Sequence, residues 1–162
     1  MNDIEWIVEL QEFPDYFIST RGRIFSDKFG KMKELKPANT GCGYLMIILM
    51  KSGKRYTKKI HRLVGKTFLE RVEGKNEIDH KSRIRTDNRV ENLKWCNHRE
   101  NNINKGINSR NKSGVKGVFF RKDRNRWIGC IQVEENKEKR KTFKTKEEAI
   151  KWRLEMEEKY YK

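Results

Sequence analysis

The apolar residues of this chain come in short runs, and turns rich in Gly, Ser and Lys separate them. Even the run over residues 44–50 is only as long as a β-strand. Just 35% of the residues are hydrophobic and 38% are charged, which disfavours one large core. Because small domains leave much of their surface in water, several modest cores suit this composition better. The pattern therefore predicts a string of small modules of the α+β class.

The first segment predicts a small β-rich module. Strand patterns flank a turn at Gly22 and a second turn at Gly53. Over residues 61–68, apolar side chains recur at helical spacing, so a short helix should lead into the centre of the chain. His61 and Arg62 stand at the start of this helix, and we assign both a structural role.

The central segment predicts a strand, a loop, a second strand and a helix. The first strand ends in Asp79-His80, and a polar loop follows it. Asn97 can cap the helix, and Glu100, three residues further on, completes a capping-box pattern. Asn101 then lies one turn inside the helix. We expect a compact ββ-α unit.

The last segment predicts a three-stranded antiparallel sheet packed on one helix. Thr145 begins a capping box, and Ala149, Trp152, Met156 and Tyr160 share one face of the helix that follows. This helix can cover only one face of the sheet. We expect the β-rich module over residues 1–60 and the ββ-α module over residues 61–104. A linker over residues 105–113 and the sheet-and-helix module over residues 114–162 should follow.

Positive charge is concentrated in the second and third parts of the chain. The net charge is +16 overall, with −1 over residues 1–50, +8 over 51–104 and +9 over 105–162. Such a distribution favours phosphate contacts over much of the molecule. A solvated basic surface, or a ribosome-associated RNA binder, would give the same charge. Charge alone leaves these alternatives open.

The central unit carries the groups that phosphodiester hydrolysis requires, namely a base for water and a cation for developing charge. Asp79 offers a carboxylate and Asn101 an amide oxygen, which suit Mg²⁺ or Mn²⁺. His80 can act as general base if the strand end twists it toward the side of Asp79, because strand side chains alternate. Asn92 can tie the loop in place. His98 is a second possible ligand, but we give it a surface role.

Asp79-His80, the segment Asn92-Leu93-Lys94-Trp95 and Asn101 resemble the HNH nuclease motif of phage and intron-encoded homing endonucleases. In that form of the motif the second metal ligand is Asn instead of His. The resemblance implies that Asp79 and Asn101 hold the metal, His80 is the general base and Asn92 braces the loop. Residues 82–84 depart from the acidic-glycine turn that often follows the motif, which leaves the shape of the loop open.

The flanking segments also resemble known modules. Residues 13–24 are similar to the small domain that precedes the HNH module in such enzymes. Residues 113–118 and 142–149 are similar to the plant APETALA/ethylene-response DNA-binding domain, whose sheet lies in the major groove. Trp127 is expected in the core. The residues expected to contact DNA are Lys116, Arg121, Gln132, Lys139 and Lys141.

We therefore expect a sequence-directed, divalent-metal-dependent DNA endonuclease that acts as a monomer on double-stranded DNA and nicks it. The alternative is a non-catalytic, sequence-specific DNA-binding regulator. No apolar run reaches the length of a membrane span, and no signal peptide or small-molecule substrate is expected. The widely spaced Cys42, Cys96 and Cys130 are interpreted as small buried side chains, which fits a reducing compartment, the cytoplasm or host DNA.

Overall fold

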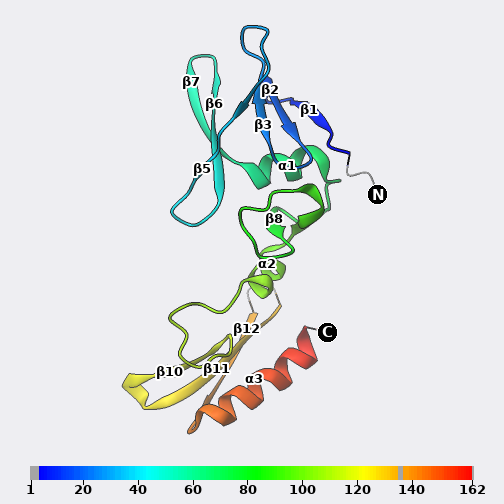
Figure 1. Cartoon of the computed structure of the whole chain (residues 1–162). Coiled ribbons are helices and arrows are strands. Elements are labelled where there is room, and N and C mark those ends of the chain that lie inside the picture. Colours follow the sequence, from blue (N-terminus) through cyan, green and yellow to red (C-terminus); the bar gives the residue numbers. More distant parts are fainter. Residues whose placement is uncertain (1–3, 135–136, 162) are drawn as a thin grey trace. The chain divides into compact units, whose positions relative to one another are not determined.

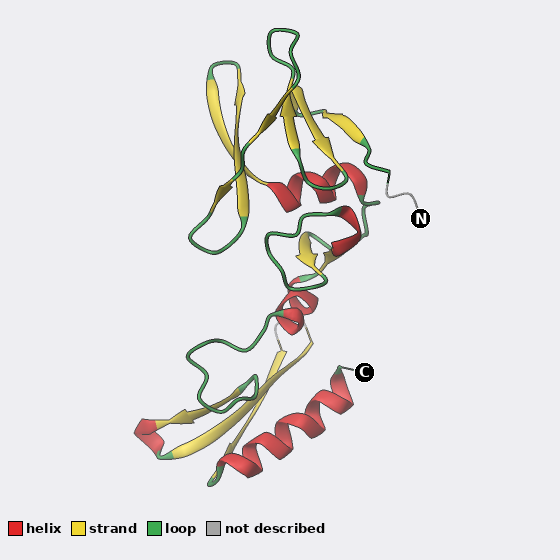
Figure 2. Ribbon diagram, viewed as in Figure 1, coloured by secondary structure: helices red, strands yellow, loops and turns green. Residues whose placement is uncertain are grey.

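The computed structural model describes residues 4–134 and 137–161. These residues form two compact units, with the boundary between Asn101 and Asn102. Figure 1 labels the elements of both units, and Figure 2 shows that unit 1 consists mostly of strands and loops. We describe each unit by itself.

Unit 1 begins with two antiparallel sheets. The first has the order β1-β2-β3-β4 and the second the order β5-β6-β7. The sequence pattern predicted the hairpins at Gly22 and Gly53 but missed β1, β4 and β5, which are short or exposed. The strands are β1 (Ile7–Leu10), β2 (Phe13–Ser19), β3 (Ile24–Ser26), β4 (Lys33–Leu35), β5 (Ala38–Asn39), β6 (Leu45–Lys51) and β7 (Lys54–Lys59).

The rest of unit 1 is a helix followed by the central hairpin. Helix α1 (Ile60–Phe68) leads to the strands β8 (Glu77–His80) and β9 (Leu93–Cys96), which pair antiparallel. A short 3-10 helix, η1 (Val90–Asn92), precedes β9, so Asn92 lies just before the strand and not within it. Helix α2 (His98–Asn104) follows and crosses the unit boundary.

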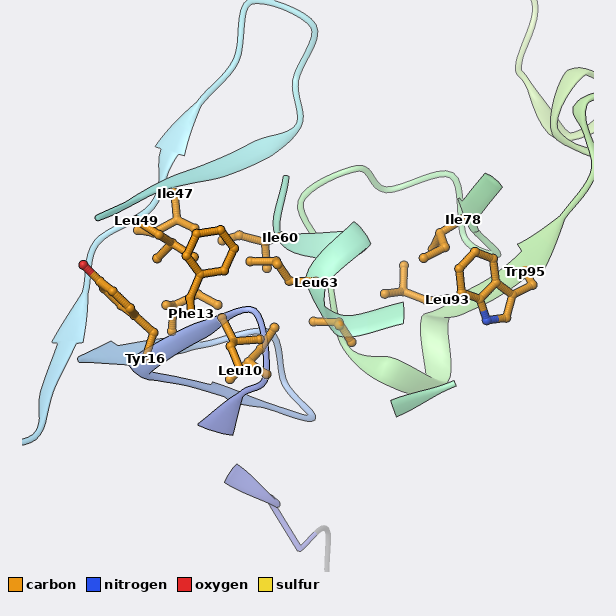
Figure 3. Close-up of a cluster of buried hydrophobic side chains, with 13 residues drawn as sticks. Leu10, Phe13, Tyr16, Ile47, Leu49, Ile60, Leu63, Ile78, Leu93 and Trp95 are labelled. Atoms are coloured by element: carbon orange, nitrogen blue, oxygen red, sulfur yellow. The ribbon is translucent and has the colours of Figure 1, made fainter. Parts of the chain in front are cut away.

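One hydrophobic core joins the two parts of unit 1. Figure 3 shows Ile78 and Trp95 of the hairpin on one side of α1, and Phe13 and Leu49 of the sheets on the other. Residues 1–60 and 61–101 therefore share a core, whereas the sequence led us to expect separate modules there. The apolar side chains are spread thinly along the chain, so each piece alone buries too little surface to fold.

A glycine allows α1 to approach the hairpin closely. A Cβ atom on Gly65 would lie 2.1 Å from the Ile78 Cδ1 atom. No other residue type leaves room for the Ile78 side chain, which is only 9% exposed. The position of β8 therefore depends on the backbone of α1.

Unit 2 is a three-stranded antiparallel sheet with one long helix. The sheet order is β10-β11-β12, as the sequence predicted, and α3 carries the predicted capping box at Thr145. The elements are β10 (Val118–Arg121), the 3-10 helix η2 (Lys122–Arg124), β11 (Arg126–Glu134), β12 (Lys137–Phe143) and α3 (Lys146–Tyr160). Residues 105–113 contain no helix or strand, but Ser113 is buried and its hydroxyl donates to the Val118 carbonyl at 2.7 Å.

Two further features bear on the sequence predictions. Of the three cysteines, Cys96 is buried and Cys130 partly buried, but Cys42 is exposed, so the prediction was wrong for Cys42. Among the described residues, no helix combines the length and apolar character needed to cross a membrane.

Candidate active site

Strand β8 presents two different faces. Ile78 and His80 are 9% and 3% exposed, whereas Glu77 and Asp79 are only half-buried. This alternation is the normal period of a β-strand. His80 keeps its pairing with Leu93, and its ring is buried as the Ile78 side chain is. The two groups belong to opposite faces of one strand end. We call these the inner face (Ile78, His80) and the outer face (Glu77, Asp79).

On the inner face, the His80 ring is held among other side chains. Its centroid lies 5.0 Å from that of His61 and 5.9 Å from that of Tyr44. The His80 Nε2 atom is 3.2 Å from the Asn88 Oδ1 atom. The Asn88 amide nitrogen donates to the Thr86 carbonyl at 3.3 Å, which fixes the amide so that its oxygen faces His80. Because an amide oxygen only accepts, the proton of the neutral imidazole resides on Nε2 and the basic nitrogen is Nδ1.

His61 is the second histidine of the inner face. It is 4% exposed, its ring centroid is 4.9 Å from that of Tyr44, and its Nδ1 atom has no hydrogen-bond partner among the described residues. Burial lowers the pKa of His61 to about 3, and electrostatic repulsion from the neighbouring basic groups, among them Arg62 and Lys59, acts in the same direction. The ring is therefore neutral at physiological pH. The sequence predicted a structural role for His61 but not its contact with His80.

The outer face of β8 meets helix α2. This helix has the predicted capping box: the Glu100 backbone N–H donates to the Asn97 side chain at 2.8 Å, and the Asn97 backbone N–H donates to the Glu100 carboxylate at 3.1 Å. The Asn101 amide nitrogen donates to one carboxylate oxygen of Glu77. The exposed His98 ring places its Nδ1 atom 3.0 Å from the other oxygen. Glu77 was missed from the sequence, although it lies two residues before Asp79 and alternation puts both on one face.

The loop between the two strands is fixed by Asn92. Its side-chain oxygen accepts from the Ser82 backbone N–H at 2.9 Å, and its amide nitrogen donates to the Asp87 carbonyl at 2.8 Å. Asn92 therefore ties both ends of the loop together while 7% exposed. Beside it, hydrogen bonds from the Arg89 guanidinium hold the pKa of the Asp87 carboxyl below its usual range.

The N-terminal sheets also support this loop. The Val90 backbone N–H donates to the Thr20 carbonyl at 2.8 Å. Gly22 has a φ of +78°, and a Cβ atom there would lie 2.7 Å from the Asn88 Cβ atom. The turn after β2 is thus packed directly against the residue that orients His80. A contact of this kind between distant segments gives no signal in a single sequence.

The outer face offers oxygen ligands for a divalent cation. Asp79 and Glu77 share this face, and the Asn101 amide is turned with its nitrogen to Glu77, which directs its oxygen away from that carboxylate. Among the described residues, no three His, Cys, Asp or Glu side chains converge as a metal-binding group. The candidate donor set is therefore a carboxylate and an amide oxygen, which fits Mg²⁺ or Mn²⁺ because these ions keep several waters.

Cys96 is not a thiolate ligand of this site. Burial raises the pKa of the Cys96 thiol to about 11, and the Asp79 and Glu77 carboxylates act in the same direction. Its Sγ atom lies 3.6 Å from the Glu77 carbonyl oxygen. Cys96 is buried and is the cross-strand partner of Glu77.

The five residues expected to contact DNA do not form one surface of unit 2. Phe143 packs on Trp152 of α3, with ring centroids 5.8 Å apart, and Lys141 and Lys139 follow it at alternate positions on the same face. The Lys139 ammonium donates to the Tyr160 hydroxyl of α3 at 2.6 Å. By the strand pairing, Gln132 and Arg121 lie on the opposite face, which α3 leaves open.

Lys116 occupies a third environment. Its ammonium donates to the backbone carbonyls of Asn102, Ile103 and Lys105. An ammonium group has three N–H donors, so these contacts occupy all of them. Lys116 thus closes the end of α2, which is a common role for a lysine at a helix C-terminus.

The hairpin β8-β9, its loop and helix α2 form the ββ-α arrangement that carries the candidate site. Residues 58–103 match the family model described as HNH endonuclease. This segment, which contains the hairpin β8-β9 and most of α2, is thus similar to an HNH endonuclease domain.

Three individual HNH endonucleases are similar to this chain. DNA endonuclease I-HmuI of Bacillus phage SP01 is 36% identical over 95 residues, covering 56% of this chain and 53% of that protein. H-N-H endonuclease F-TflII of Escherichia phage T5 is 31% identical over 86 residues, covering 52% and 44%. Uncharacterized HNH endonuclease L247 of Acanthamoeba polyphaga mimivirus is 32% identical over 95 residues, covering 58% and 23%. The chain spans about half, or less, of the curated relatives it matches.

A solved structure extends the likeness beyond the HNH segment. It is titled "DNA binding and cleavage by the HNH homing endonuclease I-HmuI". The TM-score is 0.58 at 27% identity, with 85% of this chain and 78% of that chain covered.

Proposed function

We propose that this protein is a divalent-metal-dependent DNA endonuclease of the HNH homing type, which nicks double-stranded DNA as a monomer. The observation that carries the proposal is the arrangement at the end of β8. One strand end presents a fixed imidazole on its inner face and carboxylate oxygens beside a helix amide on its outer face. I-HmuI, which the chain resembles, is described as an enzyme that binds and cleaves DNA.

In the proposed mechanism, Asp79 and Asn101 hold Mg²⁺ or Mn²⁺. When bound, the ion polarises the scissile phosphate and stabilises the charge that develops on its oxygens. His80 takes a proton from the attacking water through Nδ1, since Nε2 donates to Asn88. Asn92 keeps the loop folded so that Asn88 stays beside the ring. Asp79 and His80 are the last two residues of β8, so a phosphate bound beyond the end of this strand would be approached by the ion from the outer face and by His80 from the inner face.

We propose that unit 2 and the basic part of unit 1 bind the DNA. Residues 105–162 carry a net charge of +9, which favours a polyanion. Gln132 and Arg121 on the open face of the sheet are the candidates for groove contacts, and Lys139 and Lys141 at the edge strand are candidates for phosphate contacts. Since the Lys116 ammonium is engaged with backbone carbonyls, we give that residue a structural role.

The proposal is tested with a supercoiled plasmid, with Mg²⁺ or with EDTA. We expect the wild type to convert it to the nicked form only with Mg²⁺. Loss of a general base typically lowers the rate on the order of 10² to 10⁴-fold, so His80→Ala should nick at least about 10²-fold more slowly. Binding of a duplex is measured in parallel, with RNA as competitor.

Two outcomes would contradict the proposal. Tight duplex binding without any Mg²⁺-dependent nicking by the wild type would favour the non-catalytic DNA-binding regulator. Stronger competition by RNA than by duplex DNA would point instead to an RNA-binding protein. Equal nicking by wild type and His80→Ala would leave a nuclease but remove His80 as its base.

A further inference from the structure

Glu77 links the hairpin to helix α2 through both of its carboxylate oxygens. One oxygen lies 3.0 Å from the His98 Nδ1 atom, and the other accepts from the Asn101 amide nitrogen. His98 and Asn101 are three residues apart, so both face the same strand. Glu77 thus fixes the rotation of α2 on the outer face of β8.

This contact determines which atom of the Asn101 amide, the oxygen or the nitrogen, is available to a metal ion. A carboxylate can only accept hydrogen bonds, so the amide nitrogen must face Glu77. The amide oxygen is then directed away from it. A divalent cation binds the oxygen and not the nitrogen, so the orientation set by Glu77 is the one that a metal ligand requires.

The hydrogen bond between Glu77 and Asn101 lies in a partly buried place, where it can fix the Asn101 side chain. The Glu77 side chain is 32% exposed and Asn101 is partly buried, so the hydrogen bond is shielded in part from water. Glu77 and Asp79 are alternate residues of β8 and share its outer face. The Asn101 amide therefore contacts one carboxylate of this strand, and the Asp79 carboxylate lies two residues further along the same face.

We propose that Glu77 is a positioning residue, which presents the Asn101 amide oxygen to the divalent ion held with Asp79. It acts through Asn101 and is not itself a metal ligand. The inference rests on the proposed function, because it needs the metal site at Asp79 and Asn101. Partners that orient metal ligands typically contribute 10 to 100-fold in metal affinity.

The experiment is a Mn²⁺ titration of the DNA-free protein, followed by the EPR signal of the free aqueous ion. We expect Glu77→Ala to weaken Mn²⁺ binding on the order of 10-fold. Glu77→Gln should stay close to the wild type, because its amide oxygen can accept from Asn101 and its nitrogen can donate to His98. Glu73→Ala removes one exposed carboxylate of the same unit and should leave Mn²⁺ affinity unchanged.

A double-mutant cycle shows whether Glu77 acts through Asn101. In an Asn101→Ala background, removal of Glu77 should weaken Mn²⁺ binding no further, because the group it orients is gone. Additive losses would overturn the inference and make Glu77 a ligand or a source of charge. Equal weakening by Glu77→Gln and Glu77→Ala would also overturn it, in favour of charge.

Failure of the inference and failure of the proposed function give different results. Wild type that binds Mn²⁺ and nicks DNA, with Glu77→Ala binding the ion equally well, would overturn the inference alone. Wild type that neither binds Mn²⁺ nor nicks DNA would overturn both.

Discussion

The inner and outer faces of β8 place neighbouring residues in different environments. His80 on the inner face is 3% exposed and contacts two aromatic rings and an amide. Glu77 and Asp79 on the outer face remain half-buried beside a short helix. Because side chains alternate along a strand, a segment of four residues can supply both environments.

In the nuclease that we propose, this difference would divide the tasks of the site between the two faces of one strand. Burial restricts the imidazole to one orientation, which a general base needs. Burial on the same face also disfavours a positive charge on the neighbouring His61 ring, so His61 stays neutral. Partial exposure on the outer face keeps carboxylates hydrated and accessible to a cation and to a large anionic substrate. An ion site on the inner face would lack water ligands, and a base on the outer face would lack fixed neighbours.

The largest expected effect concerns the acid stability of the inner face. The pKa of His61 is about 3 when folded and near 6.5 when unfolded, so the unfolded state binds more protons as the pH falls below 6.5. Stability is therefore full above pH 6.5 and is lost as the pH falls toward 3. Between pH 7.5 and 4.5 this group should cost about 2–3 kcal/mol of unfolding free energy. Urea unfolding at both pH values measures it.

His61→Gln is the matched variant, since it keeps a polar planar group without a proton site in this range. It should lose less stability than the wild type over the same pH interval. An identical pH dependence in both proteins would show that His61 is not buried in its neutral form.

Much of the fold could be predicted because local patterns determine it. The capping boxes at Asn97 and Thr145, the turn glycines and the alternation in unit 2 are all encoded within a few residues. The single core of unit 1 could not be predicted, because it joins side chains as distant in sequence as Leu10 and Trp95. No local pattern shows which runs will pack together.

The candidate site divides in the same way. The motif made Asp79, His80 and Asn101 the candidate residues, and the ββ-α pattern predicted the hairpin and the helix. The groups that support them, namely Glu77, Asn88 and Tyr44, were missed because each reaches the site through a tertiary contact. For Glu77 a signal existed, since alternation already placed it on the face of Asp79. For Tyr44 there was none.

The second prediction concerns Gly22, which lies outside the inner face but packs against Asn88, the partner of His80. A Cβ atom at Gly22 would lie 2.7 Å from the Asn88 Cβ atom, and the φ of +78° disfavours any other residue. We expect Gly22→Ala to cost about 2 kcal/mol of unfolding free energy, from the left-handed backbone and the clash together. Displacing Asn88 should also slow nicking, because His80 loses its partner.

Gly53→Ala separates these two contributions. Gly53 has a φ of +73° with nothing within 4 Å, so only the backbone penalty of about 1 kcal/mol applies there. Chemical denaturation and single-turnover nicking are measured for both variants. If Gly22→Ala nicks as fast as Gly53→Ala, the N-terminal turn does not support the His80 side of the site.

The smallest expected effect concerns Asn97, which caps helix α2 beside the outer face. Asn97→Ala removes a side-chain acceptor from the Glu100 backbone N–H and should cost about 1 kcal/mol. Helix α2 has only seven residues, so this loss should make its amides exchange with solvent about fivefold faster. Because Asn101 lies within this helix, nicking should slow as well.

Thr145→Ala is the control, since it removes the equivalent cap of α3 in unit 2. It should cost a similar free energy, measured by hydrogen exchange of the α3 amides. At saturating DNA and Mg²⁺ it should leave the nicking rate unchanged, because α3 carries no group of the β8 site. The same one-residue change would then affect catalysis at one helix and only local stability at the other. Equal slowing of nicking by both variants would contradict a role of α2 in holding a metal ligand. The geometry of the outer face would then depend on β8 alone.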